Sequence, residues 1–403
     1  MGSKNYSLSD HCRYVKGAFQ SAIYNLDNGE VFSVSHKGTL FLDKALNQEE
    51  LSPEECSFLD ELEKAGLLND HSKPIEDLKM PASLDYVWLE ITNGCNCECL
   101  HCYGAFGKPK KKDIDKELKV DEWKNIIDNI YKMGCRSIQF IGGEPLVAPF
   151  FEELLRYAHD VGINRIDAFT NGTLIKEPIA KALKEVGAKV RMSIYGYDSD
   201  SHDSITQRNG SFLKLDYSIN MLKRFEIPIT PAVVLMEENQ AYLDKIIEYL
   251  QRKGLQYNGF DTVRRVRHSP QNSHCVTDPD ILKQRLMLRP RFKTSLFKYS
   301  CSLNWNNCWF GKLSIAANGD VIPCIFARDL SCGNIRNDNW DDIKQSLLEK
   351  WRITKDQVDV CKDCEYRYAC DDCRPLAIGE TGNILNKYPR CLYDPYTGEW
   401  KKP

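Results

Sequence analysis

Between residues 84 and 270, short apolar runs alternate with stretches in which apolar residues recur at helical spacing. The runs have the length of buried strands, and stretches such as 120–133 and 213–225 have the period of amphipathic helices. This alternation predicts βα units around a parallel sheet, and therefore an α/β fold. The predicted strands are Tyr86–Thr92, Ser137–Phe140, Arg165–Thr170, Lys189–Tyr195, Pro228–Met236 and Tyr257–Val263.

The first eighty residues have a different pattern, which predicts a separate small module. Two strand-like runs, 17–26 and 31–35, flank Asn28-Gly29, a pair of residues that favours a β-hairpin turn. Two helices are expected next, at 38–45 and 54–66. The polar stretch 70–83, with two prolines, then predicts a linker.

Length, charge and hydropathy narrow the class of protein. A chain of 403 residues is long enough for two or three domains. A net charge of −3 without a basic block argues against nucleic acid as a partner. No apolar run has membrane-spanning length and no apolar segment lies near the start, so we expect a cytoplasmic protein without a membrane partner. Seventeen cysteines in that compartment favour metal chemistry over disulfides.

The first chemically distinctive stretch is a cysteine loop that directly follows the first predicted strand. Cys95, Cys99 and Cys102 place three thiolates on one short loop. Three thiolates can hold three irons of a [4Fe–4S] cluster and leave the fourth iron open to another ligand. Zinc is the alternative, although a structural zinc site normally takes four protein ligands. Cys97 lies off this spacing and is not assigned to the cluster.

This spacing, with the aromatic Tyr103 after the last cysteine, resembles the signature of radical S-adenosylmethionine (SAM) enzymes. The turn Gly142-Gly143-Glu144-Pro145, after the second strand, resembles the family's glycine-rich turn for the methionine part of SAM. Glycines let a backbone carbonyl approach an ammonium group, and Glu144 adds a negative charge. The resemblance implies a partial (β/α)6 TIM-like barrel with its active site at the carboxyl ends of the strands.

The same resemblance implies further SAM contacts at strand ends. Thr170, Asn171 and Ser193 would lie near the ribose, while ordinary turn formation is the alternative for each. Arg208 would pair with the SAM carboxylate, or else be a surface arginine in a capping loop that includes His202. Leu235 would pack on the adenine, or else belong to the core. The complete set of expected SAM contacts is Tyr103, Gly142, Gly143, Glu144, Pro145, Thr170, Asn171, Ser193, Arg208 and Leu235.

The last third of the chain carries a second set of cysteines, whose spacing resembles the SPASM auxiliary-cluster domain. One interval departs from the usual form, with two residues between Cys370 and Cys373 instead of three. Eight thiolates suffice for two [4Fe–4S] clusters, and a pair of zinc sites is the alternative. By resemblance, an inner cluster is held by Cys301, Cys308, Cys324 and Cys373, and an outer cluster by Cys361, Cys364, Cys370 and Cys391.

The stretches Cys361–Cys370 and Cys391–Trp400, together with the N-terminal module, resemble one branch of these enzymes, the maturases of grasp-with-spasm systems. These are encoded beside ATP-grasp ligases and short precursor peptides. The hairpin with its helices resembles winged-helix modules that bind leader peptides, and a purely structural cap is the alternative. The expected domains are therefore a peptide-recognition module at 1–80, a radical SAM barrel at 84–270 and a SPASM domain at 271–403.

The implied reaction is oxidation of a ribosomally made peptide by a 5′-deoxyadenosyl radical, with a thioether or carbon–carbon crosslink as the expected product. The implied cofactors are SAM and three [4Fe–4S] clusters. The implied partners are the precursor peptide, an external one-electron reductant such as a flavodoxin or ferredoxin, and an ATP-grasp ligase.

Two other hypotheses stay open at this point: a radical SAM dehydrogenase of a small molecule, and a zinc-stabilised binding protein without catalysis. Ile325 occupies the position where sulfatase-maturing relatives carry a carboxylate base, which disfavours that activity. No other side chain is identified as a catalytic base.

Overall fold

The computed structural model describes residues 4–108, 115–266, 273–282, 293–371 and 373–401. The chain forms two compact units, each built from separate segments. The first comprises Met1–Pro81, Met287–Cys308 and Trp351–Pro403; the second comprises Ala82–Leu286 and Trp309–Lys350. The functional domain boundaries stay predictions, and the one between residues 270 and 271 lies outside the described residues.

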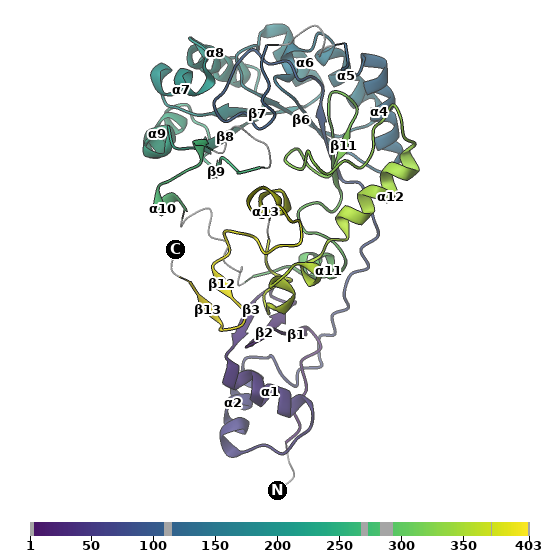
Figure 1. The fold of residues 1–403 in the computed structure, drawn as a ribbon, viewed down its shortest axis with the longest axis vertical. Coiled ribbons are helices and arrows are strands. Elements are labelled where there is room, and N and C mark those ends of the chain that lie inside the picture. The colour runs from purple at the N-terminus through teal and green to yellow at the C-terminus, as the bar shows by residue number, and fades with distance from the viewer. Residues whose placement is uncertain (1–3, 109–114, 267–272, 283–292, 372, 402–403) are drawn as a thin grey trace. The chain divides into compact units, whose positions relative to one another are not determined.

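The second unit is built on one sheet, in which six consecutive strands run parallel (Figure 1). All six expected strands are present, so the predicted α/β class is confirmed. Parallel strands end at one edge of the sheet, and the loops that follow them are therefore neighbours. In their order across the sheet the strands are β4 (Tyr86–Glu90), β5 (Ser137–Ile141), β6 (Arg165–Thr170), β7 (Lys189–Ile194), β8 (Ile229–Leu235) and β9 (Phe260–Thr262).

Amphipathic helices connect these strands, and each buries one stripe of apolar side chains. In α4 (Val120–Lys132) the stripe is Trp123, Ile126, Ile127 and Ile130, the spacing that places side chains on one helical face. The other connecting elements are η1 (Pro145–Val147), α5 (Phe151–Val161), α6 (Glu177–Glu185), α7 (Ser199–Thr206), α8 (Ser211–Arg224), η2 (Gln240–Tyr242) and α9 (Leu243–Arg252), and α10 (Pro279–Ile281) follows the last strand. None of the helices in the described ranges is both long and apolar enough to cross a membrane.

The C-terminal third contains a hairpin that extends the barrel sheet. Strands β10 (Lys312–Ile315) and β11 (Val321–Ile322) pair antiparallel around a turn in which Gly319 adopts a positive φ of 92°. Strand β10 also pairs parallel with β4, with Leu313 opposite Val87. The sheet therefore has eight strands in the order β11-β10-β4-β5-β6-β7-β8-β9. Helix α12 (Trp340–Trp351) follows this hairpin.

The first unit begins with a three-stranded antiparallel sheet followed by two helices. The expected hairpin is confirmed as β2 (Ser21–Asn25) and β3 (Val31–Val34), and the helices as α1 (His36–Leu46) and α2 (Pro53–Lys64). Ser52 and Glu55 form a reciprocal capping box at the start of α2. Strand β1 (Cys12–Lys16) was not predicted. Its sequence, Cys-Arg-Tyr-Val-Lys, does not alternate strictly between apolar and polar residues.

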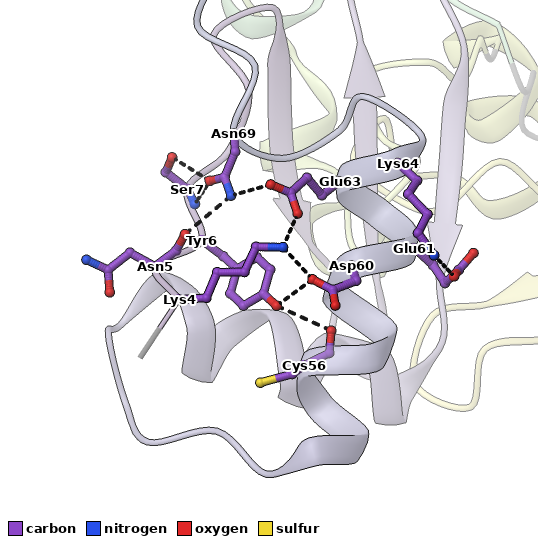
Figure 2. A network of polar contacts seen from close by, with 10 residues as sticks. All are labelled: Lys4, Asn5, Tyr6, Ser7, Cys56, Asp60, Glu61, Glu63, Lys64 and Asn69. Atoms are coloured by element: carbon purple, nitrogen blue, oxygen red, sulfur yellow. Dashed lines mark hydrogen bonds and ion pairs between the residues drawn. The ribbon is translucent and has the colours of Figure 1, made fainter. Parts of the chain in front are cut away.

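Polar contacts anchor the first described residues to the end of this module (Figure 2). The Tyr6 hydroxyl donates to Asp60 Oδ1 over 2.8 Å, and Lys4 pairs with both Asp60 and Glu63 on α2. The Ser7 amide donates to Asn69 Oδ1, also over 2.8 Å. The N-terminal segment thus closes against α2 and the turn that follows it.

Both faces of the small sheet are covered. One face, with Ile23 and Val34, packs against the helices at Leu42 and Leu59. The opposite face, which includes Tyr24, packs against aromatic residues from 299 to 393. The hydroxyl of Tyr24 also donates to the carbonyl of Glu365 over 2.8 Å. The N-terminal strands therefore share a hydrophobic core with the C-terminal cysteine-rich segment.

That C-terminal segment consists of short elements joined by turns. They are α11 (Leu296–Asn304), η5 (Lys355–Gln357), η6 (Cys361–Asp363), α13 (Arg374–Thr381), β12 (Tyr393–Asp394) and β13 (Glu399–Trp400). Strands β12 and β13 pair antiparallel.

Candidate functional site

The cysteine loop lies at the carboxyl end of β4 and forms one wall of a cavity of about 460 Å³ in the second unit. Cys95, Cys99 and Cys102 all line this cavity, which we call the barrel cavity. Backbone hydrogen bonds fix the loop to the end of α7, from the Glu98 amide to the Thr206 carbonyl (3.1 Å) and from the Leu100 amide to the Ile205 carbonyl (3.0 Å). The three thiols expected to bind iron are thus held on one wall. Cys97 lines the same cavity.

The glycine-rich turn packs directly against the start of this loop. The amide of Gly143 donates to the Thr92 carbonyl over 2.8 Å, and that of Glu144 donates to the Gly94 carbonyl over 2.9 Å. A Cβ at Gly142 would lie 2.3 Å from the Thr92 carbonyl oxygen, and Gly142 also has a φ of 148°. Glycine is therefore required here by a close backbone approach. Gly142 and Gly143 both line the barrel cavity.

Glu144 is fully buried and joins two strand ends. Its carboxylate accepts hydrogen bonds from Thr170 Oγ1 (2.7 Å), from the Asn171 amide (2.7 Å) and from the Leu146 amide (3.2 Å). Burial raises the pKa of Glu144 to about 7, although these donors favour the charged form. Neither Glu144 nor Pro145 is among the residues that line the cavity. In this structure Glu144 holds the end of β6 against the turn after β5.

The expected ribose contacts are brought together at the neighbouring strand ends. Thr170, Asn171 and Ser193 all line the barrel cavity. Asn171 Nδ2 donates to Asn96 Oδ1 over 2.8 Å, which links the end of β6 to the cysteine loop. These side chains thus flank the thiols, as the strand order requires.

Arg208 and Leu235 do not line the barrel cavity. The Arg208 guanidinium donates to the Asn96 carbonyl, so it contacts the cysteine loop from outside the cavity. Leu235 is fully buried in the core. Both remain predictions as SAM contacts.

The segment around Arg208, expected to be a loop, is largely helical. It contains the end of α7, a turn and the start of α8. Asp203 accepts from the Phe212 amide over 2.8 Å and from Ser211 Oγ over 2.6 Å. This carboxylate ties the two helices together. His202 Nδ1 accepts from the Tyr195 amide over 3.3 Å, a structural role.

A buried ion pair beside the cavity was not predicted. Tyr103 lines the cavity, and its hydroxyl donates to Glu90 Oε1 over 3.0 Å. Arg328 donates to both oxygens of Glu90, each at 2.7 Å. Burial raises the pKa of Glu90, while the Arg328 charge opposes that shift. The only signal in the sequence is a carboxylate inside an apolar strand, and its partner lies far away along the chain.

Several other residues that line the barrel cavity were not predicted from the sequence as part of the site. Gln139 and Arg191 each stand two positions before a lining residue of their own strand, so that period two would have placed them on the same face. Ile325 also lines the cavity, at the position where sulfatase-maturing relatives carry a carboxylate. His101 lines it as well; burial lowers its pKa to about 4, so its imidazole is neutral near pH 7.

The first unit contains a second, smaller cavity, which gathers four cysteines of the C-terminal segment. We call it the outer-cluster cavity; it is lined by Cys361, Cys364, Cys370 and Cys391. These are the four residues expected to hold the outer cluster, and their thiols are suitable ligands for iron. Of the expected inner-cluster ligands, Cys301, Cys308 and Cys373 belong to the first unit and Cys324 to the second.

None of the seventeen cysteines, all within the described ranges, forms a disulfide. Among the described residues, no three His, Cys, Asp or Glu side chains are arranged to hold a single metal ion. A [4Fe–4S] cluster is a different case, because each of its thiolates binds a different iron. The ligand sets stay predictions.

Comparison with known proteins identifies the family. The profile of the radical SAM superfamily matches residues 89–250, and that of the SPASM iron–sulfur cluster-binding domain matches residues 307–365. The chain belongs to the radical SAM superfamily and carries a SPASM domain. It is therefore an enzyme, which excludes a zinc-stabilised binding protein without catalysis, and its two domains imply SAM and iron–sulfur clusters as cofactors.

Relatives of this chain are named for different activities. An AdoMet-dependent heme synthase of Methanosarcina barkeri is 27% identical over 76% of this chain and 95% of its own length. A PqqA peptide cyclase of Bradyrhizobium diazoefficiens is 26% identical over 77% of this chain and 86% of its own length. The crystal structure of Streptococcus suis SuiB bound to its precursor peptide SuiA superposes with a TM-score of 0.62 at 15% identity, over 96% of this chain and 99% of SuiB. That likeness confirms the fold.

Proposed function

We propose that this enzyme is a maturase that oxidatively modifies a ribosomally made precursor peptide, forming a thioether or carbon–carbon crosslink. One observation carries the proposal: three thiols of the cysteine loop line a cavity of about 460 Å³ together with the polar ends of three neighbouring strands. When bound there, SAM and its cluster would supply a 5′-deoxyadenosyl radical. The chain's own residues bind SAM, position the target carbon and exclude water.

The residues of the proposed site have two roles: some would bind the cluster and others would contact SAM. Cys95, Cys99 and Cys102 would hold the SAM-binding cluster, while Thr170 and Ser193 offer hydroxyls to the nucleoside. The remaining proposed contacts act from the cavity wall or support it; they are Tyr103, Gly142, Gly143, Glu144, Pro145, Asn171, Arg208 and Leu235. The two auxiliary clusters would take the electron that an oxidative crosslink releases.

The relatives favour a peptide substrate. The PqqA peptide cyclase is named for its peptide substrate, and SuiB was crystallised with its precursor peptide. The SuiB similarity extends over the N-terminal module as well, since it covers 96% of this chain. We infer that residues 1–80 bind a leader peptide, which would add a strand to the sheet at β3.

The geometry of β3 supports this inference. It is an edge strand, paired with β2 on one side. On its other side, the described residues contribute only a bridge between Glu30 and Lys293. Within the described residues, Val31–Val34 have no further backbone pairing on that side, which supports an extended peptide as the partner of this edge.

Ile325 bears on the type of oxidation. It lines the barrel cavity and cannot accept a proton, so a carboxylate-assisted oxidation of a sulfatase residue is disfavoured. The proposal also includes the remaining partners of a cytoplasmic system: an external reductant such as a flavodoxin or ferredoxin, and an ATP-grasp ligase.

A small-molecule substrate is the second candidate, because the heme synthase matches 95% of its own length to this chain. The deciding experiment is anaerobic co-expression with the precursor peptide encoded beside the gene. We expect mass spectrometry to show a precursor that has lost two hydrogens for each crosslink. An unchanged precursor in the presence of 5′-deoxyadenosine formation would favour the small molecule instead.

A further inference from the structure

The outer-cluster cavity is lined by positive charge as well as by thiols. Lys355, Arg367 and Lys387 all line it, and no carboxylate of the described residues does. The wall therefore presents three cationic side chains around the four thiols. Iron–sulfur clusters with four thiolates are anionic, so this charge is complementary to the group expected there.

The cations are held in place by the surrounding chain. Arg367 donates from Nη1 to the carbonyl of Cys364 over 2.8 Å and from Nε to Asp356 Oδ1 over 2.9 Å. Lys387 Nζ donates to the carbonyl of Tyr393. Lys355 is buried, with 9% of its surface exposed. Fixed charges act on a cluster more strongly than solvated ones, because little water screens them.

One buried carboxylate lies close by in the sequence but is directed elsewhere. Glu365 is fully buried and does not line the cavity. Its Oε1 accepts from Gln20 Nε2 over 2.9 Å and from the hydroxyl of Tyr393. Its charge and that of Asp356, which pairs with Arg367, oppose the cations, but neither carboxylate lines the cavity.

We propose that Lys355, Arg367 and Lys387 form a collar that raises the reduction potential of the outer auxiliary cluster. The proposal rests on the proposed function. Loss of one hydrogen atom leaves a carbon radical on the peptide. Formation of the crosslink would then release one proton and one electron, and a cluster held by the four thiols would take up the electron. A positive collar stabilises that additional negative charge.

The test is a redox titration followed by electron paramagnetic resonance, using reconstituted full-length protein. Cys95, Cys99 and Cys102 are changed to alanine in all samples, so that only auxiliary clusters contribute. Lys387→Gln removes the charge but keeps a donor for the Tyr393 carbonyl. We expect the reduced fraction of one signal to fall about tenfold at a fixed potential, a shift of about 59 mV to more negative values. That signal should be the one lost in Cys391→Ala.

Two matched variants control the experiment. Lys387→Arg keeps the charge and should restore the potential. Lys362→Gln removes a lysine that follows Cys361 in the chain but does not line the cavity and is half exposed, and it should leave the potential unchanged. If Lys387→Gln and Lys355→Gln both leave the reduction potential of this signal at its wild-type value, the proposal that the collar raises the potential is wrong. If iron and sulfide analysis finds no auxiliary cluster, the proposed function itself fails.

Discussion

At the scale of single residues, the cysteine loop presents four thiols to one cavity, although the spacing assigns only three of them to iron. Cys97 is buried, and its Sγ accepts from Asn171 Nδ2 over 3.6 Å. Its neighbours Cys95 and Cys99 line the same wall. The motif is local in sequence, which is why its position at a strand end could be predicted.

The assignment of three ligands can be tested directly. Changing Cys95, Cys99 and Cys102 together to alanine should abolish formation of 5′-deoxyadenosine and remove one cluster's worth of iron, because the auxiliary ligands lie elsewhere. Cys97→Ala is the matched control and should keep both. Iron analysis and chromatography of the products check the outcome. Retained 5′-deoxyadenosine in the triple variant would falsify the assignment.

Gly142 makes a second residue-scale prediction. Gly142→Ala should lower the free energy of unfolding by about 1–3 kcal/mol and disturb the cysteine loop, because its Cβ would meet the Thr92 carbonyl at 2.3 Å. Gly134→Ala is the control, since Gly134 also has a positive φ but no atom lies within 4 Å of an added Cβ. Urea unfolding compares the two. Equal losses would show that backbone strain alone accounts for the effect.

Glu144 should give the stability a measurable pH dependence. Its pKa is raised from 4.5 to about 7, so the folded protein binds this proton more tightly than the unfolded chain. The resulting stabilisation is complete below pH 4.5 and is lost as the pH rises through 7. Wild-type protein should therefore lose up to about 1.4 kcal/mol per pH unit more than Glu144→Gln over this range. Urea unfolding at several pH values measures the difference, and parallel profiles contradict it.

At the scale of elements, the sequence predicted what depends on local periodicity and missed what depends on distant partners. The six parallel strands and the turn at Asn28-Gly29 carry their own signals. Glu90 and Arg328 are paired only through the fold, and nothing near either residue indicates the other. Strand β1 is defined by its pairing with β2 and not by its own pattern.

Strand β3 offers an element-scale test of leader binding. The Asn25 amide bonds to the Glu30 carbonyl, so the antiparallel alternation turns the amide of Ser33 outward. Ser33→Pro should remove that donor and weaken binding of a fluorescent precursor peptide, while SAM cleavage without peptide persists. Ser33→Ala is the control, because it loses only the hydroxyl contact with Tyr366. Fluorescence anisotropy titrations measure the affinity of each variant for the precursor peptide. Equal affinities of the two variants would indicate that the N-terminal module is a structural cap.

At the scale of the whole chain, the N-terminal strands and the cysteine-rich C-terminal segment share one core. Tyr24 packs against Tyr299, and Tyr366 packs against Tyr393 in the same cluster. The sequence predicted a separate small module, because periodicity within the first eighty residues gives no sign of a partner more than two hundred residues away.

Deleting residues 1–80 should therefore do more than remove peptide binding. It uncovers apolar surface on the segment that carries the outer-cluster cysteines, so we expect aggregation or loss of about one cluster's worth of iron. Size-exclusion chromatography with iron analysis checks this. A monodisperse truncation with full iron content contradicts the shared core.

The pairing of β10 with β4 has a consequence for the order in which the protein is made. During translation, β4 leaves the ribosome long before Lys312 of β10 is synthesised. Until then one edge of the barrel sheet has unpaired backbone groups, which can join the edge of another nascent chain. Completion of the sheet is thus delayed until the C-terminal third emerges. Slow translation between β9 and β10 would lengthen the time for which the edge of β4 stays unpaired.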